Sequence, residues 1–130
     1  FEYPSNDDVE NDNIIYSYEK INDIKMIDNS ILGKWILKEL DYQSYKTNID
    51  PFIAFSITNK CLKDGIEYSY EVSFGSQYNK IIFSNDNTTL KGIYKINENN
   101  DLIIKTNPNE YPVDFNINRD DSSIIYTYSK

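Results

Sequence analysis

The chain contains no histidine, and this absence removes several kinds of chemistry at once. Without an imidazole there is no Ser-His or Cys-His catalysis, no histidine metal ligand, and no side chain whose ordinary pKa lies near neutral pH. A single cysteine, Cys61, excludes an internal disulfide bond. Cys61 falls on the apolar register of a predicted strand, so we interpret it as a buried, unreactive thiol.

Glycine is scarce as well, with four residues in 130. They stand at positions 33, 65, 75 and 92, too far apart to form a phosphate-binding loop. The adjacent acids Asp120 and Asp121 fall in a predicted polar turn, where carboxylates are normally solvated rather than catalytic. We therefore predict no catalytic residue, no cofactor and no metal site, and the sequence favours a protein that is not an enzyme.

Positive charge is also in short supply. The formal net charge is −8, with a sequence pI of about 4.4. This balance argues against nucleic acid as a partner, because phosphate binding needs a basic face, and against an anionic membrane surface. No run of 18 apolar residues is present, so no transmembrane segment is predicted. The excess of Ile, Asn and Lys over a single Arg is typical of translation from an AT-rich genome.

The N-terminal part of the chain, residues 1–23, is predicted to be an acidic extension. Its first 12 residues carry five acidic side chains and no basic one, which is typical of a solvated tail or linker. The acids at positions 7, 8, 10 and 12 lack the Asp-x-Asp-x-Asp-Gly spacing of a calcium loop, so the tail interpretation is preferred.

The sequence begins with Phe1 rather than methionine. We expect an exported protein, in the periplasm, on the cell surface, secreted or in a vacuole, whose leader has been removed. A shortened sequence would look the same.

Residues 24–130 are predicted to form one all-β domain. Ile24, Ile27 and Ile31 have the spacing of one face of a short helical turn. From residue 34 the apolar period becomes two, which predicts eight strands, at 34–40, 52–62, 66–74, 78–83, 88–96, 102–106, 111–117 and 122–128. Short turns favour antiparallel pairing in sequence order, and closure removes both exposed edges. We predict an eight-stranded antiparallel up-and-down β-barrel, with a β-sandwich as the alternative.

The segment Gly33-Lys34-Trp35 begins the first predicted strand and holds the only tryptophan. A Gly-x-Trp in this position, ahead of eight meandering strands, resembles the lipocalins and the wider calycin superfamily over residues 24–130. The resemblance implies that Gly33 and Trp35 are structural, with the indole packed across the closed end of the barrel beneath an arginine. The only arginine, Arg119, precedes the last predicted strand and fits this role. An ordinary exposed turn arginine is the alternative.

An eight-stranded barrel has room for side chains or for one small ligand. The inward registers carry tyrosines and apolar residues, which suit a lipid, a sterol or a porphyrin-like molecule. No Arg or Lys falls on these registers, so a neutral or weakly polar ligand is favoured. The candidate ligand-binding residues are Phe55, Ile57, Tyr68, Tyr70, Val72, Phe83, Tyr94, Phe115 and Tyr126. The first hypothesis is therefore a protein that carries or senses a small apolar ligand, and the structural alternative is that these residues fill a core.

The second hypothesis is recognition of another protein, as in an inhibitor, an immunity protein or a surface lipoprotein domain. A small acidic domain attracts basic partners. Tyr42, Tyr45 and the loop to Pro51 form the longest predicted connection and offer a contact surface. The two hypotheses differ in what they require of the barrel, because a ligand needs a continuous apolar cavity and a protein-binding module does not.

Overall fold

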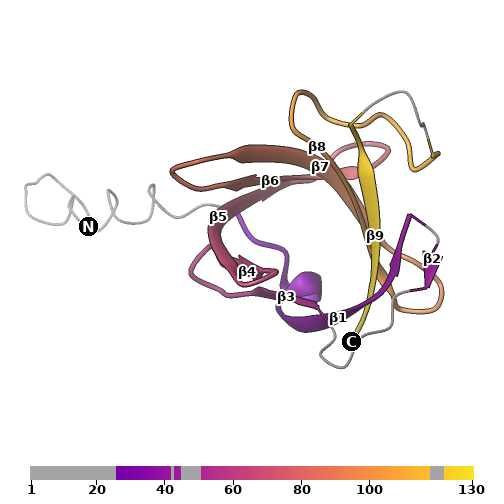
Figure 1. Cartoon of the computed structure of the whole chain (residues 1–130), viewed down its shortest axis with the longest axis horizontal. Coiled ribbons are helices and arrows are strands. Elements are labelled where there is room, and N and C mark those ends of the chain that lie inside the picture. The colour runs from indigo at the N-terminus through magenta and orange to yellow at the C-terminus, as the bar shows by residue number, and fades with distance from the viewer. Residues whose placement is uncertain (1–25, 42, 45–50, 118–121) are drawn as a thin grey trace, which may run out of the picture.

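The computed structural model describes residues 26–41, 43–44, 51–117 and 122–130. These residues form a closed antiparallel β-barrel with one turn of 3-10 helix, η1 (Asn29–Ile31), which the strands encircle in Figure 1. The predicted fold class is confirmed: the barrel is eight-stranded and up-and-down, with a helical turn before its first strand. The predicted extension at 1–23, the loop tyrosines Tyr42 and Tyr45, and Arg119 lie outside the described residues.

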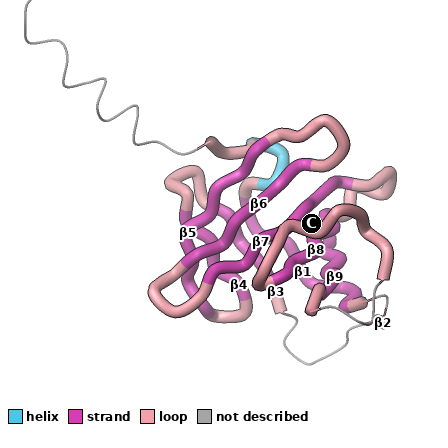
Figure 2. Tube along the Cα trace, turned by 90° about the horizontal axis from the view of Figure 1, so that it is seen from above, coloured by secondary structure: helices cyan, strands magenta, loops and turns pink. Residues whose placement is uncertain are grey.

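The barrel strands follow one another in sequence order, and β9 pairs back onto β1 with Leu37 opposite Tyr128. This pairing closes the sheet and protects edges that would otherwise template aggregation. A short strand, β2 (Gln43–Ser44), adds to the end of β1. Figure 2 shows the strands as the wall of the molecule, with the helical turn in cyan at its edge. The eight barrel strands are β1 (Gly33–Leu40), β3 (Phe52–Phe55), β4 (Lys60–Lys63), β5 (Ile66–Ser73), β6 (Asn79–Ser84), β7 (Thr89–Ile96), β8 (Leu102–Asn107) and β9 (Ile124–Ser129).

Strand β5 shows why the sequence forms this sheet. Tyr68, Tyr70 and Val72 are buried, and the residues between them are exposed, as a strand with one wet face requires. The hairpin before β5 turns at Asp64 and Gly65, which have φ angles of 54° and 80°. Positive φ at both central residues is the geometry of a primed two-residue turn, and Asp-Gly adopts it at low cost.

The predicted strand at 52–62 is wrong because it is two strands. β3 ends at Phe55 and β4 begins at Lys60, and the turn between them includes Asn59 with a φ of 63°. The backbone N–H of Ser56 donates to the Lys60 carbonyl at 2.8 Å, and the Lys60 N–H donates to the Ser56 hydroxyl at 3.1 Å. Short polar side chains that form hydrogen bonds with nearby backbone groups compete with the extended strand conformation, and in this segment a turn forms instead of a continuous strand.

The predicted strand at 111–117 is wrong because that segment is an irregular loop. At the end of β8, the side-chain carbonyl of Asn107 accepts bonds from the N–H groups of Asn109 and Glu110, at 2.8 and 3.3 Å. These bonds turn the chain out of the sheet, as asparagine does in an Asx turn. Pro112 then lacks an N–H for a ladder. The two errors offset, so the predicted number of barrel strands is right.

The only tryptophan, Trp35 of β1, is buried and 3% exposed. Its Nε1–H donates to the Ile31 carbonyl of η1 at 2.9 Å, which fixes the helical turn against the first strand. The ammonium of Lys130 lies 4.4 Å from the centre of a Trp35 ring and donates to the Leu32 carbonyl at 2.7 Å. Within the described residues, the cation over the tryptophan is therefore a lysine after β9. The role predicted for Arg119 stays a prediction.

We predict that Lys130→Met lowers the free energy of unfolding by about 0.5–2 kcal/mol, because it removes a cation–π contact and leaves a carbonyl without its donor. Urea denaturation followed by the fluorescence of the single tryptophan measures this change. Arg119→Met is the matched comparison, and we expect it to change stability by less than about 0.5 kcal/mol, because Lys130 already lies over the tryptophan ring. A larger loss of stability in the Arg119 variant than in the Lys130 variant would indicate that the arginine is the cation that stabilises Trp35.

Candidate functional site

Seven of the nine predicted lining residues come together inside the barrel. Six of them are buried, and Tyr126 is partly buried against the same cluster. Their rings contact one another: the Phe55 and Tyr70 centroids lie 5.0 Å apart edge to face, and the Phe55 and Phe83 centroids 6.2 Å apart. Contacts between aromatic rings add stability to a core beyond the stability that comes from the apolar area they bury. The seven are Phe55, Tyr68, Tyr70, Val72, Phe83, Tyr94 and Tyr126.

The other two predicted lining residues do not face the interior. Ile57 is 67% exposed, because it stands in the β3–β4 turn rather than in a strand. Phe115 is buried on the outside of the barrel, where its ring meets Tyr78 edge to face with centroids 5.0 Å apart. Both placements were wrong for the same reason, since the period-two pattern was extended through residues that are not in a strand.

The interior is tightly packed around Gly92 of β7. A Cβ atom at this position would lie 2.9 Å from the Lys105 carbonyl oxygen and 3.2 Å from the Ile81 side chain. Cys61 lies in the same core at 1% exposure, and burial raises the pKa of its thiol to about 12. A protonated, enclosed thiol is a poor nucleophile.

One inward position is cationic, and this corrects the prediction that no Arg or Lys faces the interior. Lys63 pairs with the buried Ile53 and is 6% exposed, with Nζ 4.2 Å from the centre of the Tyr126 ring and 3.2 Å from Asp64 Oδ2. Burial lowers the pKa of the ammonium, but Tyr126 and Asp64 outweigh it and leave the pKa raised. Lys63 was missed because it was assigned to the hairpin turn instead of the end of β4.

A second layer of packing lies on the outside of β7, β8 and β9. Ile93, Lys105 and Ile125 stand directly opposite one another on these three strands and face away from the interior. All three are nevertheless buried, as is Phe115. Buried residues on the outer face of a sheet need a cover, and the segment 108–117 between β8 and β9 provides it.

Lysine–aromatic contacts attach this segment to the sheet. The Tyr111 ring has the ammonium of Lys80 at 4.8 Å from its centre and that of Lys91 at 5.9 Å. Lys95 lies 4.7 Å from the centre of the Phe115 ring. A cation over an aromatic face gains about 0.5–1 kcal/mol at an exposed site, so the three contacts together hold the segment in place.

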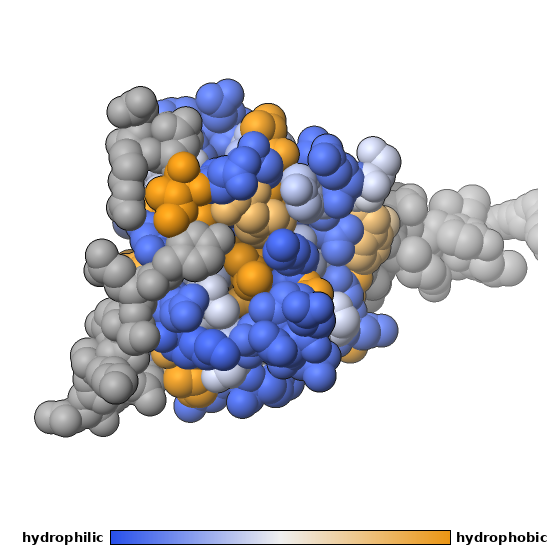
Figure 3. Space-filling model, turned by 90° about the vertical axis from the view of Figure 1, so that its right-hand side faces the viewer, coloured by the Kyte–Doolittle hydropathy of each residue, from blue (hydrophilic) through white to orange (hydrophobic). Residues whose placement is uncertain are grey.

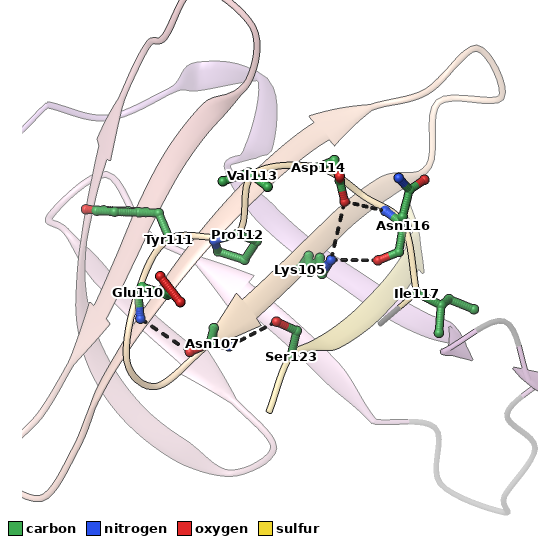
Figure 4. A pocket seen from close by; sticks show the side chains of 10 residues that line it. All are labelled: Lys105, Asn107, Glu110, Tyr111, Pro112, Val113, Asp114, Asn116, Ile117 and Ser123. Carbon is green, nitrogen blue, oxygen red and sulfur yellow. Dashed lines mark hydrogen bonds and ion pairs between the residues drawn. The ribbon is translucent and has the colours of Figure 1, made fainter. Parts of the chain in front are cut away.

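Between the segment and the sheet lies a half-open pocket of about 540 Å³ (Figure 4). Its charged wall is Lys105, whose side chain is 5% exposed. The Lys105 ammonium donates to the Asn116 carbonyl at 2.6 Å and lies 3.7 Å from Asp114 Oδ1. The pocket is lined by Lys105, Asn107, Glu110, Tyr111, Pro112, Val113, Asp114, Asn116, Ile117 and Ser123.

Neither metal-binding groups nor membrane-spanning helices were found in the part of the chain that the structure describes. No three acidic or thiol side chains there lie close enough to hold a metal ion. No helix in the same part is long and apolar enough to cross a membrane.

The class of protein that these observations define is a closed eight-stranded antiparallel β-barrel with one cluster of buried core side chains and an outer covering segment. Comparison with protein-family models, curated proteins and solved structures found no match for the chain. The resemblance to lipocalins therefore stays a prediction.

We predict that Gly92→Ala lowers the free energy of unfolding by about 1–3 kcal/mol, the usual cost of adding a methyl group to a filled core. Urea denaturation measures the loss. Ser73→Ala, on the exposed face of β5, serves as the control and is expected to stay within about 0.5 kcal/mol of the wild type. A Gly92→Ala variant as stable as the wild type would mean that the interior holds unfilled space at this point.

Proposed function

We propose that this chain is a non-enzymatic module that binds another protein through its outer surface. The proposal is supported chiefly by the packed interior, where Tyr70, Phe83 and Tyr94 are each no more than 2% exposed. A ligand inside the barrel would have to displace these side chains from one another, whereas a protein partner uses the surface and needs no cavity.

The surface best suited to contact is formed by the covering segment 108–117. Val113 is 80% exposed and Ile117 is 42% exposed. Both line the pocket over Lys105. Figure 3 shows the side of the molecule that carries β9 and β2, where apolar side chains lie among polar ones. An apolar centre with a polar rim is the usual anatomy of an interface.

The charge around this surface favours a basic partner. The segment 108–117 contains two acidic residues, Glu110 and Asp114, and no basic residue. Both acids line the rim of the pocket beside Val113. Carboxylates around an apolar contact increase the rate of association with a positively charged protein and lose this effect as salt rises.

Carriage of a small ligand inside the barrel is the second candidate, and Lys63 is the observation in its favour. A buried ammonium beside Tyr126 offers an anchor for an acidic head group. Such a ligand would be an apolar acid rather than the neutral molecule that the sequence favours. The packed aromatic cluster makes this the weaker proposal.

The experiment is a comparative pull-down with the 130-residue chain as bait, at low and at high salt. The double variant Val113→Ser/Ile117→Ser should lose at least about tenfold in captured partner, because it removes the apolar centre of the surface. The control is Ile57→Ser/Leu62→Ser, two side chains 67% and 38% exposed in the β3–β4 turn and on β4, neither of which lines a pocket with Val113.

We expect the control variant to capture as much partner as the wild type, and high salt to reduce capture by the wild type. A partner that the Val113/Ile117 variant retains, or that the control variant alone loses, would contradict the proposed surface.

A further inference from the structure

Beneath the covering segment lies a buried cation, Lys105, whose ion-pair partner among the described residues is Asp114. Lys105 is 5% exposed at its side chain, and its short bond is to the neutral carbonyl of Asn116, at 2.6 Å. The Asp114 carboxylate is 3.7 Å from the ammonium, which is beyond hydrogen-bonding distance. A buried charge is costly unless it is paired and hydrogen-bonded, so this ammonium retains the capacity to bind an anionic group.

The pocket also presents a negative group next to this cation. Asp114 is 43% exposed at its side chain, and its Oδ1 accepts the Asn116 N–H at 3.0 Å. This bond fixes the carboxylate in the wall, beside the ammonium, as Figure 4 shows. A simple anion that approaches Lys105 therefore meets a negative charge too, and a simple cation that approaches Asp114 meets a positive one.

A molecule that carries both charges on neighbouring atoms avoids this conflict. In a free α-amino acid one carbon separates the carboxylate from the ammonium, which matches a Lys–Asp pair whose charged atoms lie 3.7 Å apart. Head-to-tail pairing gives the ligand carboxylate to Lys105 and the ligand ammonium to Asp114, so that two charge-assisted hydrogen bonds replace one long ion pair. Pro112, Val113 and Ile117 line the rest of the pocket and offer contact to an apolar side chain.

We propose that this pocket binds a free α-amino acid with an apolar side chain. Its volume, about 540 Å³, lies within the range of small-molecule sites, roughly 300–1,000 Å³. The proposal goes beyond partner binding and does not depend on it, because the contacts that it uses are all within this chain.

Three probes of similar size separate the contributions of the two ligand charges to binding. Leucine carries both groups, isocaproate keeps the carboxylate without the amine, and isoamylamine keeps the amine without the carboxylate. Each is titrated into the isotopically labelled chain and followed by amide chemical shifts in segment 108–117. We expect leucine to bind with an affinity in the millimolar range or better, and each single-charge analogue to bind at least about tenfold more weakly, since each loses one charged hydrogen bond.

Two variants test which charged side chain of the protein binds which charged group of the ligand. Asp114→Asn keeps the oxygen that accepts the Asn116 N–H and removes the negative charge, so it should weaken leucine binding at least about tenfold and leave isocaproate binding equal or stronger. Lys105→Met should abolish binding of leucine. Lys60→Met is the control, because Lys60 is an exposed lysine on β4 that bonds Ser69 and does not line the pocket.

The proposal is overturned if leucine causes no shift in this segment at about 10 mM, or if isoamylamine binds as well as leucine. It is overturned equally if Asp114→Asn binds leucine as tightly as the wild type does. This last variant decides the question even if Lys105→Met does not fold.

Discussion

The rest of the structure depends on the aromatic side chains that meet inside the barrel. Phe55 stands between Tyr70 and Phe83, and their ring centroids lie 5.0 and 6.2 Å away. These contacts require that the strands close at a radius that side chains alone can fill. Gly92 adds a second constraint, since a methyl group there would lie 2.9 Å from the Lys105 carbonyl oxygen and 3.2 Å from Ile81. Under the proposed function, a barrel packed in this way acts as a scaffold, and its outer surface makes the contacts with a partner.

The covering segment between β8 and β9 carries the surface that we propose for binding. It shields the outward-facing Ile93 and Ile125, and lysines of the sheet hold its aromatic rings. The segment thus gains a defined shape although it has no regular secondary structure. Loops positioned by a rigid sheet commonly carry binding residues. Here the segment presents exposed apolar side chains at its surface and the Lys105–Asp114 pair beneath it.

The sequence predicted the parts of the fold in which alternation and turn chemistry agree. The strand around Tyr70 and the Asp64–Gly65 hairpin are of this kind, because one face is buried and the turn needs positive φ. The candidate site was harder to predict. Alternation in 111–117 comes from a loop that packs on the outside, which period alone cannot distinguish from a strand. Burial of Lys63 and Lys105 depends on neighbours far away in the sequence.

Native mass spectrometry of the purified chain tests the central claim, that the barrel is filled by its own side chains, most directly. The protein should appear at the 15.3 kDa mass of the chain alone, and it should stay there after incubation with fatty acids, sterols and porphyrins at concentrations that saturate known carriers. The contrary result is a stoichiometric adduct with any of these molecules that persists in the Lys105→Met and Val113→Ser variants, which alter the outer pocket. Such an adduct would place a ligand inside the barrel and contradict the filled interior.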